Sequence, residues 1–86
     1  MQYFFRTIDV RKQGRNASVP LVKLLYPDVP CAALGEAIDQ AKRCVLESDR
    51  TLMLQSDACF RNKNEVQTKY RCWIDERGVF NERTLG

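Results

Sequence analysis

The clearest pattern in the chain runs from Pro30 to Ser48, where apolar residues recur with the period of an α-helix. We place Val29 as the N-cap and Pro30 at the first helical position, where proline is tolerated. The apolar arc of this helix contains Cys31, Leu34, Ala37, Ile38, Ala41, Cys44 and Val45. Several of these residues are small, so the pattern predicts an amphipathic helix that a sheet can approach closely.

The N-terminal segment alternates as a strand does. We predict a strand over Gln2 to Lys12, and both of its faces begin with an aromatic residue. One face carries Phe4, Ile8 and Val10 with Arg6 among them, and the other carries Tyr3, Phe5, Thr7, Asp9 and Arg11. Residues 13–18 have turn composition. The segment from Val19 to Tyr26 fits either a second strand or a short helix capped by Ser18, and pairing with the first strand favours the strand.

After residue 50 the period changes from 3.6 to 2. This predicts two strands, Thr51 to Arg61 and Glu65 to Asp75, joined by a three-residue loop in which Asn64 takes the left-handed conformation. The register of this hairpin pairs Ser56 with Tyr70, Asp57 with Lys69, Gln55 with Arg71 and Met53 with Trp73. A two-residue loop would place core residues opposite surface residues, which argues against it.

The C-terminal segment carries a weaker signal. Val79 and Phe80 can add a short edge strand or pack under the helix, and residues 81–86 are expected to fray. We therefore predict a single α+β domain over residues 1–86. Its antiparallel sheet has three to four strands, and the helix packs across one face.

The composition agrees with one small globular domain. The chain has 86 residues, of which 44% are hydrophobic and 29% are charged, and its net charge is +3. That charge is too small for a dense nucleic-acid-binding stripe and of the wrong sign for a mimic of DNA. We find neither a secretory signal nor an apolar run of membrane-spanning length, so we expect a soluble cytoplasmic protein without a membrane partner.

Catalytic chemistry has little support in the sequence. There is no histidine, and the four cysteines form no CxxC pair, so reduced thiols are favoured over one disulfide or a metal site. No glycine-rich phosphate loop or HExxH motif is present. Asp75 and Glu76 are adjacent carboxylates of the kind that usually solvate a turn. We expect a protein that is not an enzyme and that has no cofactor and no metal.

The informative feature is the sheet face predicted to lie opposite the helix. Large apolar residues rimmed by charges on such a face are typical of a docking surface. The expected partner-binding residues are Trp73, Arg71, Lys69, Tyr3, Phe5, Met53, Gln55, Arg11, Lys12 and Arg15. Alternatively, the Val19 to Tyr26 segment or the C-terminal tail folds over this face, or two copies form a homodimer through it.

Two functional classes follow from this surface. In the first, the protein binds another protein, because tryptophan, tyrosine and arginine dominate interface energetics. In the second, the face stacks single-stranded nucleic acid on its aromatic residues while Arg11, Lys12, Arg15, Lys69 and Arg71 meet phosphates. The modest charge and the absence of the RNA-recognition strand motif place protein binding first.

The chain also resembles a known group of proteins in size and layout. The strand QYFFRTIDV, the helix CAALGEAIDQAKRCV and the hairpin strand VQTKYRCWID resemble the arrangement of several small phage-encoded anti-CRISPR proteins. This resemblance implies a non-enzymatic inhibitor that docks on a protein or nucleoprotein defence complex in the cytoplasm of a bacterial host. It implies no particular functional residue.

Overall fold

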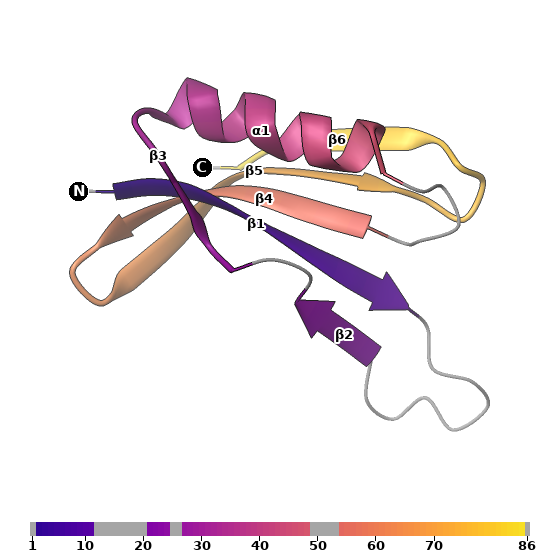
Figure 1. The fold of residues 1–86 in the computed structure, drawn as a ribbon, viewed down its shortest axis with the longest axis horizontal. Helices are drawn as coiled ribbons and strands as arrows, with labels where there is room; N and C mark the ends of the chain where they lie inside the picture. Colours follow the sequence, from indigo (N-terminus) through magenta and orange to yellow (C-terminus); the bar gives the residue numbers. More distant parts are fainter. Residues whose placement is uncertain (1, 12–20, 25–26, 49–53, 86) are drawn as a thin grey trace.

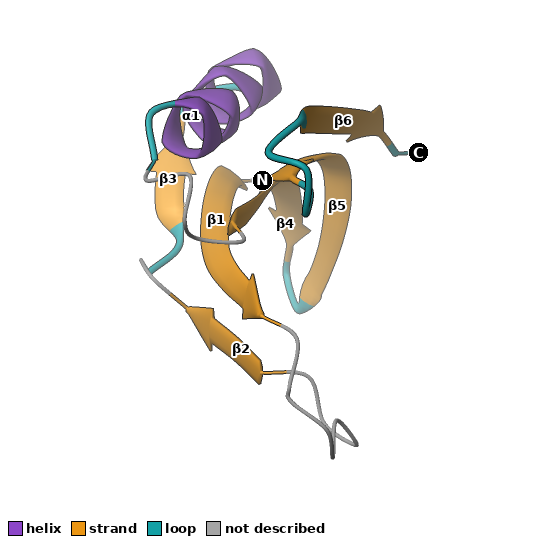
Figure 2. Ribbon diagram, turned by 90° about the vertical axis from the view of Figure 1, so that its right-hand side faces the viewer, coloured by secondary structure: helices purple, strands orange, loops and turns teal. Residues whose placement is uncertain are grey.

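The fold is an antiparallel sheet with one helix packed across one face, as Figures 1 and 2 show. The computed structural model describes residues 2–11, 21–24, 27–48 and 54–85. Its elements are β1 (Gln2–Arg11), β2 (Leu21–Leu24), β3 (Val29–Cys31), α1 (Leu34–Leu46), β4 (Leu54–Asn62), β5 (Glu65–Ile74) and β6 (Phe80–Thr84). The strand order is β2-β1-β4-β5-β6, and β3 pairs with β1 as well. The predicted α+β class is confirmed, with a wider sheet than expected.

The first edge of the sheet is shared by two short strands. β2 pairs with the second half of β1 and β3 pairs with its first half. The strand alternative therefore holds for Leu21 to Leu24, whereas residues 19, 20, 25 and 26 lie outside the described part of the chain. The expected helix start was wrong, because Val29 and Pro30 belong to β3 and the N-cap is Ala33. The free backbone N–H and C=O groups at the edge of β1 pair with Val29 to Cys31, so this segment forms a strand and the helix begins after it.

The apolar side of α1 forms the centre of the core, as the periodicity predicts. Ala37, Ala41 and Val45 are completely buried, and Leu34 and Ile38 pack against the same cluster. The alanines allow close contact with β1, β4 and β5. Among the residues that the structure describes, no helix is long and apolar enough to span a bilayer.

The two faces of β1 are the reverse of what we expected. Phe5 is 6% exposed and packs with the helix, and Tyr3 packs beside it, whereas Phe4 points to the other face. The cause is a buried polar contact on the helix side of the sheet. Thr7, the next residue after Phe5 on this face of β1, pairs with Ser56 of β4. Both side chains are completely buried, and their hydroxyl oxygens lie 2.9 Å apart. Each hydroxyl satisfies the other, so polar residues tolerate the helix side of the strand. Tyr3 and Phe5 therefore lie on the helix side of the sheet and not on the face where we predicted them.

The β4–β5 hairpin corrects the predicted loop and register. Asn62 pairs with Glu65, so the turn has two residues, and its positive φ of 55° belongs to Lys63 rather than to Asn64. The pairing shifts by one residue between Ala58 and Cys59, which leaves Lys69 as the extra residue of a β-bulge. Beyond the bulge, the partners are Ser56 with Cys72, Asp57 with Arg71 and Gln55 with Trp73. The bulge restores core residues opposite core residues despite the two-residue turn.

Lys63→Gly is expected to stabilise the domain by about 0.5 to 1 kcal/mol. A positive φ at the first central position of a two-residue hairpin turn is strained for lysine and free for glycine. The measurement is the free energy of unfolding in urea. Asn64→Gly is the matched control, because Asn64 has no positive φ, and an equal gain from both variants would contradict the strain argument.

The C-terminal segment is a regular strand, so the expectation of a frayed tail was wrong. Asp75 organises the turn before it, because its carboxylate accepts hydrogen bonds from the backbone N–H groups of Arg77 and Val79 at 2.9 and 3.0 Å. Gly78 takes a φ of 78° in the same turn. This turn returns the chain beside β5, and Phe80 to Thr84 pair with Ile74 to Tyr70. Asp75 therefore has a structural role in this turn, in line with the expectation that its carboxylate serves the turn.

Candidate binding surface

The sheet face opposite the helix, called the outer face below, is built from rows of residues that cross the strands. Arg6 of β1 pairs with Asp57 of β4, Asp57 pairs with Arg71 of β5, and Arg71 pairs with Arg83 of β6. The neighbouring row runs through Ile8, Gln55, Trp73 and Asn81. Of the predicted binding residues, this face brings together Gln55, Arg71 and Trp73.

The other predicted binding residues do not join this group. Lys69 is the bulge residue of β5. Arg11 ends β1 opposite Leu21, and nothing further is described of its side chain. Lys12, Arg15 and Met53 lie outside the described residues. The predicted cover is also wrong for the described segments, since β2 and β6 extend the sheet at its two ends and do not fold over it.

One half of the outer face is closed by an arginine cluster, which consists of Arg6, Arg61 and Asp28. Arg6 donates two hydrogen bonds to Asp28, at 2.7 and 3.1 Å, and Arg61 donates one at 2.9 Å. Both guanidinium groups lie over the ring of Phe4, at 5.7 and 4.5 Å from its centroid. Phe4 is only 3% exposed, and Cys59 beside it is equally well covered. Phe4 and Cys59 are therefore shielded from a partner on this half of the face.

The arginine cluster makes the stability of the domain sensitive to acid. Hydrogen bonds from Arg6, with help from Arg61, hold the pKa of the Asp28 carboxyl below its ordinary value. Because the folded pKa is the lower one, the stabilisation is complete above the unfolded pKa of about 3.9 and disappears as the pH falls through the folded value.

Asp28→Asn is expected to cost about 1 kcal/mol at neutral pH, a modest value because the side chains of Asp28 and Arg6 are 26% and 41% exposed. The difference from wild type should shrink below about pH 4, where Asp28 of the wild type also loses its charge. Unfolding in urea at pH 7, 5, 4 and 3 measures it. A difference that stays constant down to pH 3 would show that the ion pairs do not stabilise the fold.

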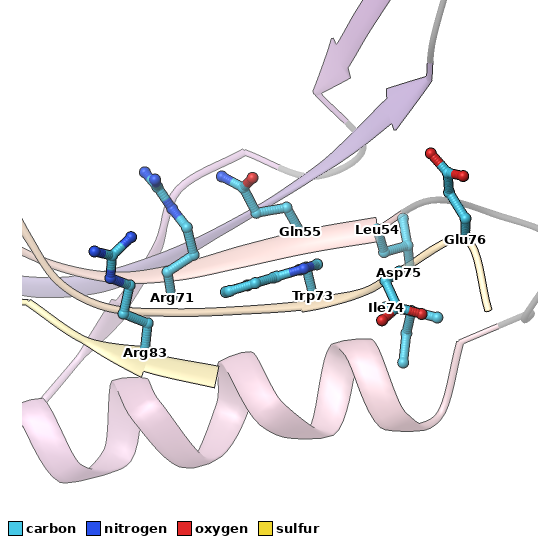
Figure 3. Close-up of a pocket in the computed structure, with 8 residues that line it drawn as sticks. All are labelled: Leu54, Gln55, Arg71, Trp73, Ile74, Asp75, Glu76 and Arg83. Atoms are coloured by element: carbon cyan, nitrogen blue, oxygen red, sulfur yellow. The ribbon is translucent and has the colours of Figure 1, made fainter. Parts of the chain in front are cut away.

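The other half of the outer face is open and contains a pocket of about 370 Å³, which we call the tryptophan pocket (Figure 3). Its lining residues are Leu54, Gln55, Arg71, Trp73, Ile74, Asp75, Glu76 and Arg83. Figure 3 shows Gln55, Arg71 and Glu76 projecting away from the helix, whereas Ile74 points towards it. Trp73 is half-buried, so its ring forms part of the pocket wall and remains accessible. A pocket of this size accepts one or two side chains of a partner.

Charge in the tryptophan pocket is unevenly matched. Arg71 donates two hydrogen bonds to Asp57, at 2.9 and 3.2 Å, and this contact raises the pKa of the Arg71 guanidinium. Arg83 lies directly opposite Arg71 on β6, and no carboxylate of the described residues pairs with it. Like charges opposite one another on neighbouring strands repel. The row thus ends with a cation that an acidic group from outside the chain would neutralise.

Sequence reasoning missed three residues of this face, namely Arg83, Asp28 and Phe4. The signal for Arg83 was the run from Asp75 to Gly78 between apolar residues, which is a turn that returns the chain as a strand. Asp28 sits in the connector between β2 and β3, and no periodic pattern indicates that its carboxylate reaches β1 and β4.

The four cysteines are free thiols, and Cys59 of β4 and Cys72 of β5 are buried. Burial raises the pKa of Cys72 to about 11, and burial likewise raises the pKa of Cys59. Both thiols are therefore protonated near neutral pH and are weak nucleophiles. Across the described ranges, no three potential metal ligands among cysteine, aspartate and glutamate come together.

Comparison of the chain with protein-family models, with curated proteins and with solved structures finds no match.

Proposed function

We propose that this protein is a small non-enzymatic binding module that docks on another protein through the tryptophan pocket. The observation that carries the proposal is the grouping of Trp73, Arg71 and Arg83 on the open half of the outer face. Tryptophan and arginine are the residues most enriched among those that dominate binding energy at interfaces. A half-buried indole next to a cation that no described carboxylate neutralises offers both an apolar contact and a charged one.

A protein partner fits this surface better than single-stranded nucleic acid. Stacking of successive bases needs several accessible rings, but Tyr3 and Phe5 face the helix and Phe4 lies under the arginine cluster. Arg6, Arg61 and Arg71 are already engaged by Asp28 and Asp57. Among the described arginines of the outer face, Arg83 remains for phosphates, and Glu76 adds a negative group to the pocket.

The proposal extends to the kind of partner. The resemblance to small anti-CRISPR proteins favours a larger bacterial protein or nucleoprotein complex, which the module would inhibit by occupying a surface. An interface centred on a single tryptophan pocket suits a rigid domain that inhibits by blocking a surface of its partner. Such inhibition requires binding alone and no catalytic step by the module. A homodimer through the outer face is the competing use of the same residues.

A pull-down from a bacterial lysate, run beside gel shifts with single- and double-stranded DNA and RNA at two salt concentrations, tests the proposal. Recovery of one stoichiometric protein whose binding depends on Trp73 supports it. Salt-sensitive retention of nucleic acid by the isolated domain, with no protein recovered, would favour the alternative. Sedimentation of the purified protein distinguishes a homodimer, since a dimer that buries Trp73 would also contradict docking on a different protein.

Arg83→Gln is expected to weaken partner binding by about 1 to 2 kcal/mol while it leaves the free energy of unfolding within about 0.5 kcal/mol of wild type. Arg83 is exposed and makes no ion pair with a described carboxylate, so the fold does not depend on its charge. Arg43→Gln is the matched control. Arg43 is exposed on the polar side of α1, and its substitution removes the same charge. Equal losses from both variants would assign the effect to net charge rather than to the pocket.

A further inference from the structure

The two ends of the sheet differ in how open they are to another strand. At the β1 end, pairing is divided between the short strands β2 and β3, and β3 contains Pro30, which cannot donate a hydrogen bond. Short strands and proline are common protection for sheet edges. β6 at the other end has no proline, and its register with β5 is regular over all five residues. Within the described part of the chain, the sheet therefore has one protected edge and one open edge.

The hydrogen-bonding groups on the open edge can be assigned from the ladder. Asp75 donates to the carbonyl of Val79 and Leu85 donates to the carbonyl of Lys69, at 3.0 and 2.9 Å. In an antiparallel pair the bonded positions alternate, so the backbone of Asn81 and Arg83 faces β5. The N–H and C=O groups of Phe80, Glu82 and Thr84 then point to the open edge, where none of the described residues pairs with them.

The side chains of β6 specify which strand this edge fits. On the outer face, the row of charges runs through Arg6, Asp57 and Arg71 and ends at Arg83, so the next position in the row calls for a carboxylate. On the helix side, the Glu82 carboxylate accepts a hydrogen bond from Tyr70 and lies 3.5 Å from the Lys42 amine, so its charge does not guard the edge. Phe80 is half-buried on that side and would pack against an apolar residue.

We propose that the partner docks as an extended acidic segment that adds to the open edge of β6, with an aspartate or glutamate opposite Arg83. This inference rests on the proposed function and specifies the shape and charge of the bound segment. Backbone pairing with Phe80, Glu82 and Thr84 provides affinity, and the carboxylate next to Arg83 provides selectivity. Its side chains on the outer face lie one strand beyond Arg83, at the border of the tryptophan pocket.

The probe is an eight-residue peptide of alternating valine and threonine with one central threonine replaced by glutamate. N-methylation of alternate residues leaves one pairing edge and prevents the peptide from stacking on itself. A second peptide of the same sequence is methylated on every residue, so neither of its edges can pair. A third carries lysine in place of glutamate. Each is titrated into the isotope-labelled full chain, and amide exchange and the indole signal of Trp73 are followed by NMR.

The expected result is slower exchange of the Phe80, Glu82 and Thr84 amides with the glutamate and lysine peptides, and unchanged exchange with the fully methylated peptide. The glutamate peptide should bind about threefold to tenfold more tightly than the lysine peptide, and Arg83→Gln should remove that difference. Thr84→Pro removes one edge donor without loss of a ladder bond and should weaken binding, whereas Thr84→Ala should not.

Two results would overturn the inference. If the glutamate peptide shifts the Trp73 indole but leaves the three edge amides unprotected, docking on the outer face stands and strand addition is wrong. If neither signal changes, an acidic strand does not bind this edge, and the proposed function is then judged by its own pull-down experiment.

Discussion

Phe5→Ala is expected to cost about 3 to 5 kcal/mol of the free energy of unfolding, the largest effect of a single substitution that we predict. Phe5 is 6% exposed and packs in the core with Ala37 and Ala58, so truncation leaves a cavity that the surrounding sheet and helix cannot fill. Urea unfolding followed by circular dichroism measures the loss. Because small domains have limited stability, this variant should be partly unfolded at 37 °C.

The comparison for Phe5 is Val66→Ala, since Val66 is 46% exposed near the hairpin tip and should change stability by less than about 0.5 kcal/mol. The fraction of Phe5→Ala that remains folded should bind the partner as wild type does. A variant that stays stable but loses the partner would place Phe5 on the outer face, as its alternation with Phe4 first suggested, and would reverse the orientation of β1.

Trp73→Ala is expected to weaken partner binding by about 2 kcal/mol or more, which is about thirtyfold in affinity. The indole forms a wall of the tryptophan pocket between Gln55 and Arg71, and its removal eliminates the largest apolar contact there. The free energy of unfolding should fall by only about 1 kcal/mol, because Trp73 is half-buried and points away from the helix. Affinity by calorimetry and stability by urea unfolding are measured on the same preparations.

Trp73→Phe is the matched variant, since it keeps an aromatic ring in the pocket and should retain part of the affinity. If Trp73→Ala unfolds the domain, the indole belongs to the core and the docking proposal loses its main residue. If Trp73→Ala folds and binds the partner as wild type does, the partner contacts another surface.

The helix could be predicted from the sequence because its apolar residues share one arc and because small residues suit contact with a sheet. Ala37, Ala41 and Val45 are buried as predicted. Its start could not be predicted, because the preference of Pro30 for the first turn of a helix competes with pairing of Val29 and Cys31 against β1. Tertiary pairing outweighed the local preference.

The orientation of β1 was beyond the reach of hydrophobicity alone. Its more apolar face, with Phe4, points away from the helix, because two guanidinium groups cover that ring. Its more polar face can be buried because Thr7 and Ser56 satisfy each other. Both arrangements depend on contacts between residues far apart in the chain, and single-sequence alternation carries no information about them.

The candidate site was predicted in part. Alternation correctly placed Gln55, Arg71 and Trp73 on one face, although the bulge at Lys69 changed their partners across the hairpin. Arg83 was missed because a strand of five residues next to the chain end has too few alternations to stand out from a tail. The turn from Asp75 to Gly78 was the better signal.

The most direct test of docking at the tryptophan pocket uses the fact that Trp73 is the only tryptophan in the chain. Its fluorescence is recorded in the free protein and in the complex with the captured partner. A tryptophan-free version of the partner, or fluorinated tryptophan at position 73, separates the emission of Trp73 from that of the partner. We expect the emission to move to shorter wavelength and acrylamide quenching to fall severalfold in the complex, because the half-exposed indole becomes covered. Emission and quenching that remain those of the free protein while the partner is bound would contradict docking at this pocket.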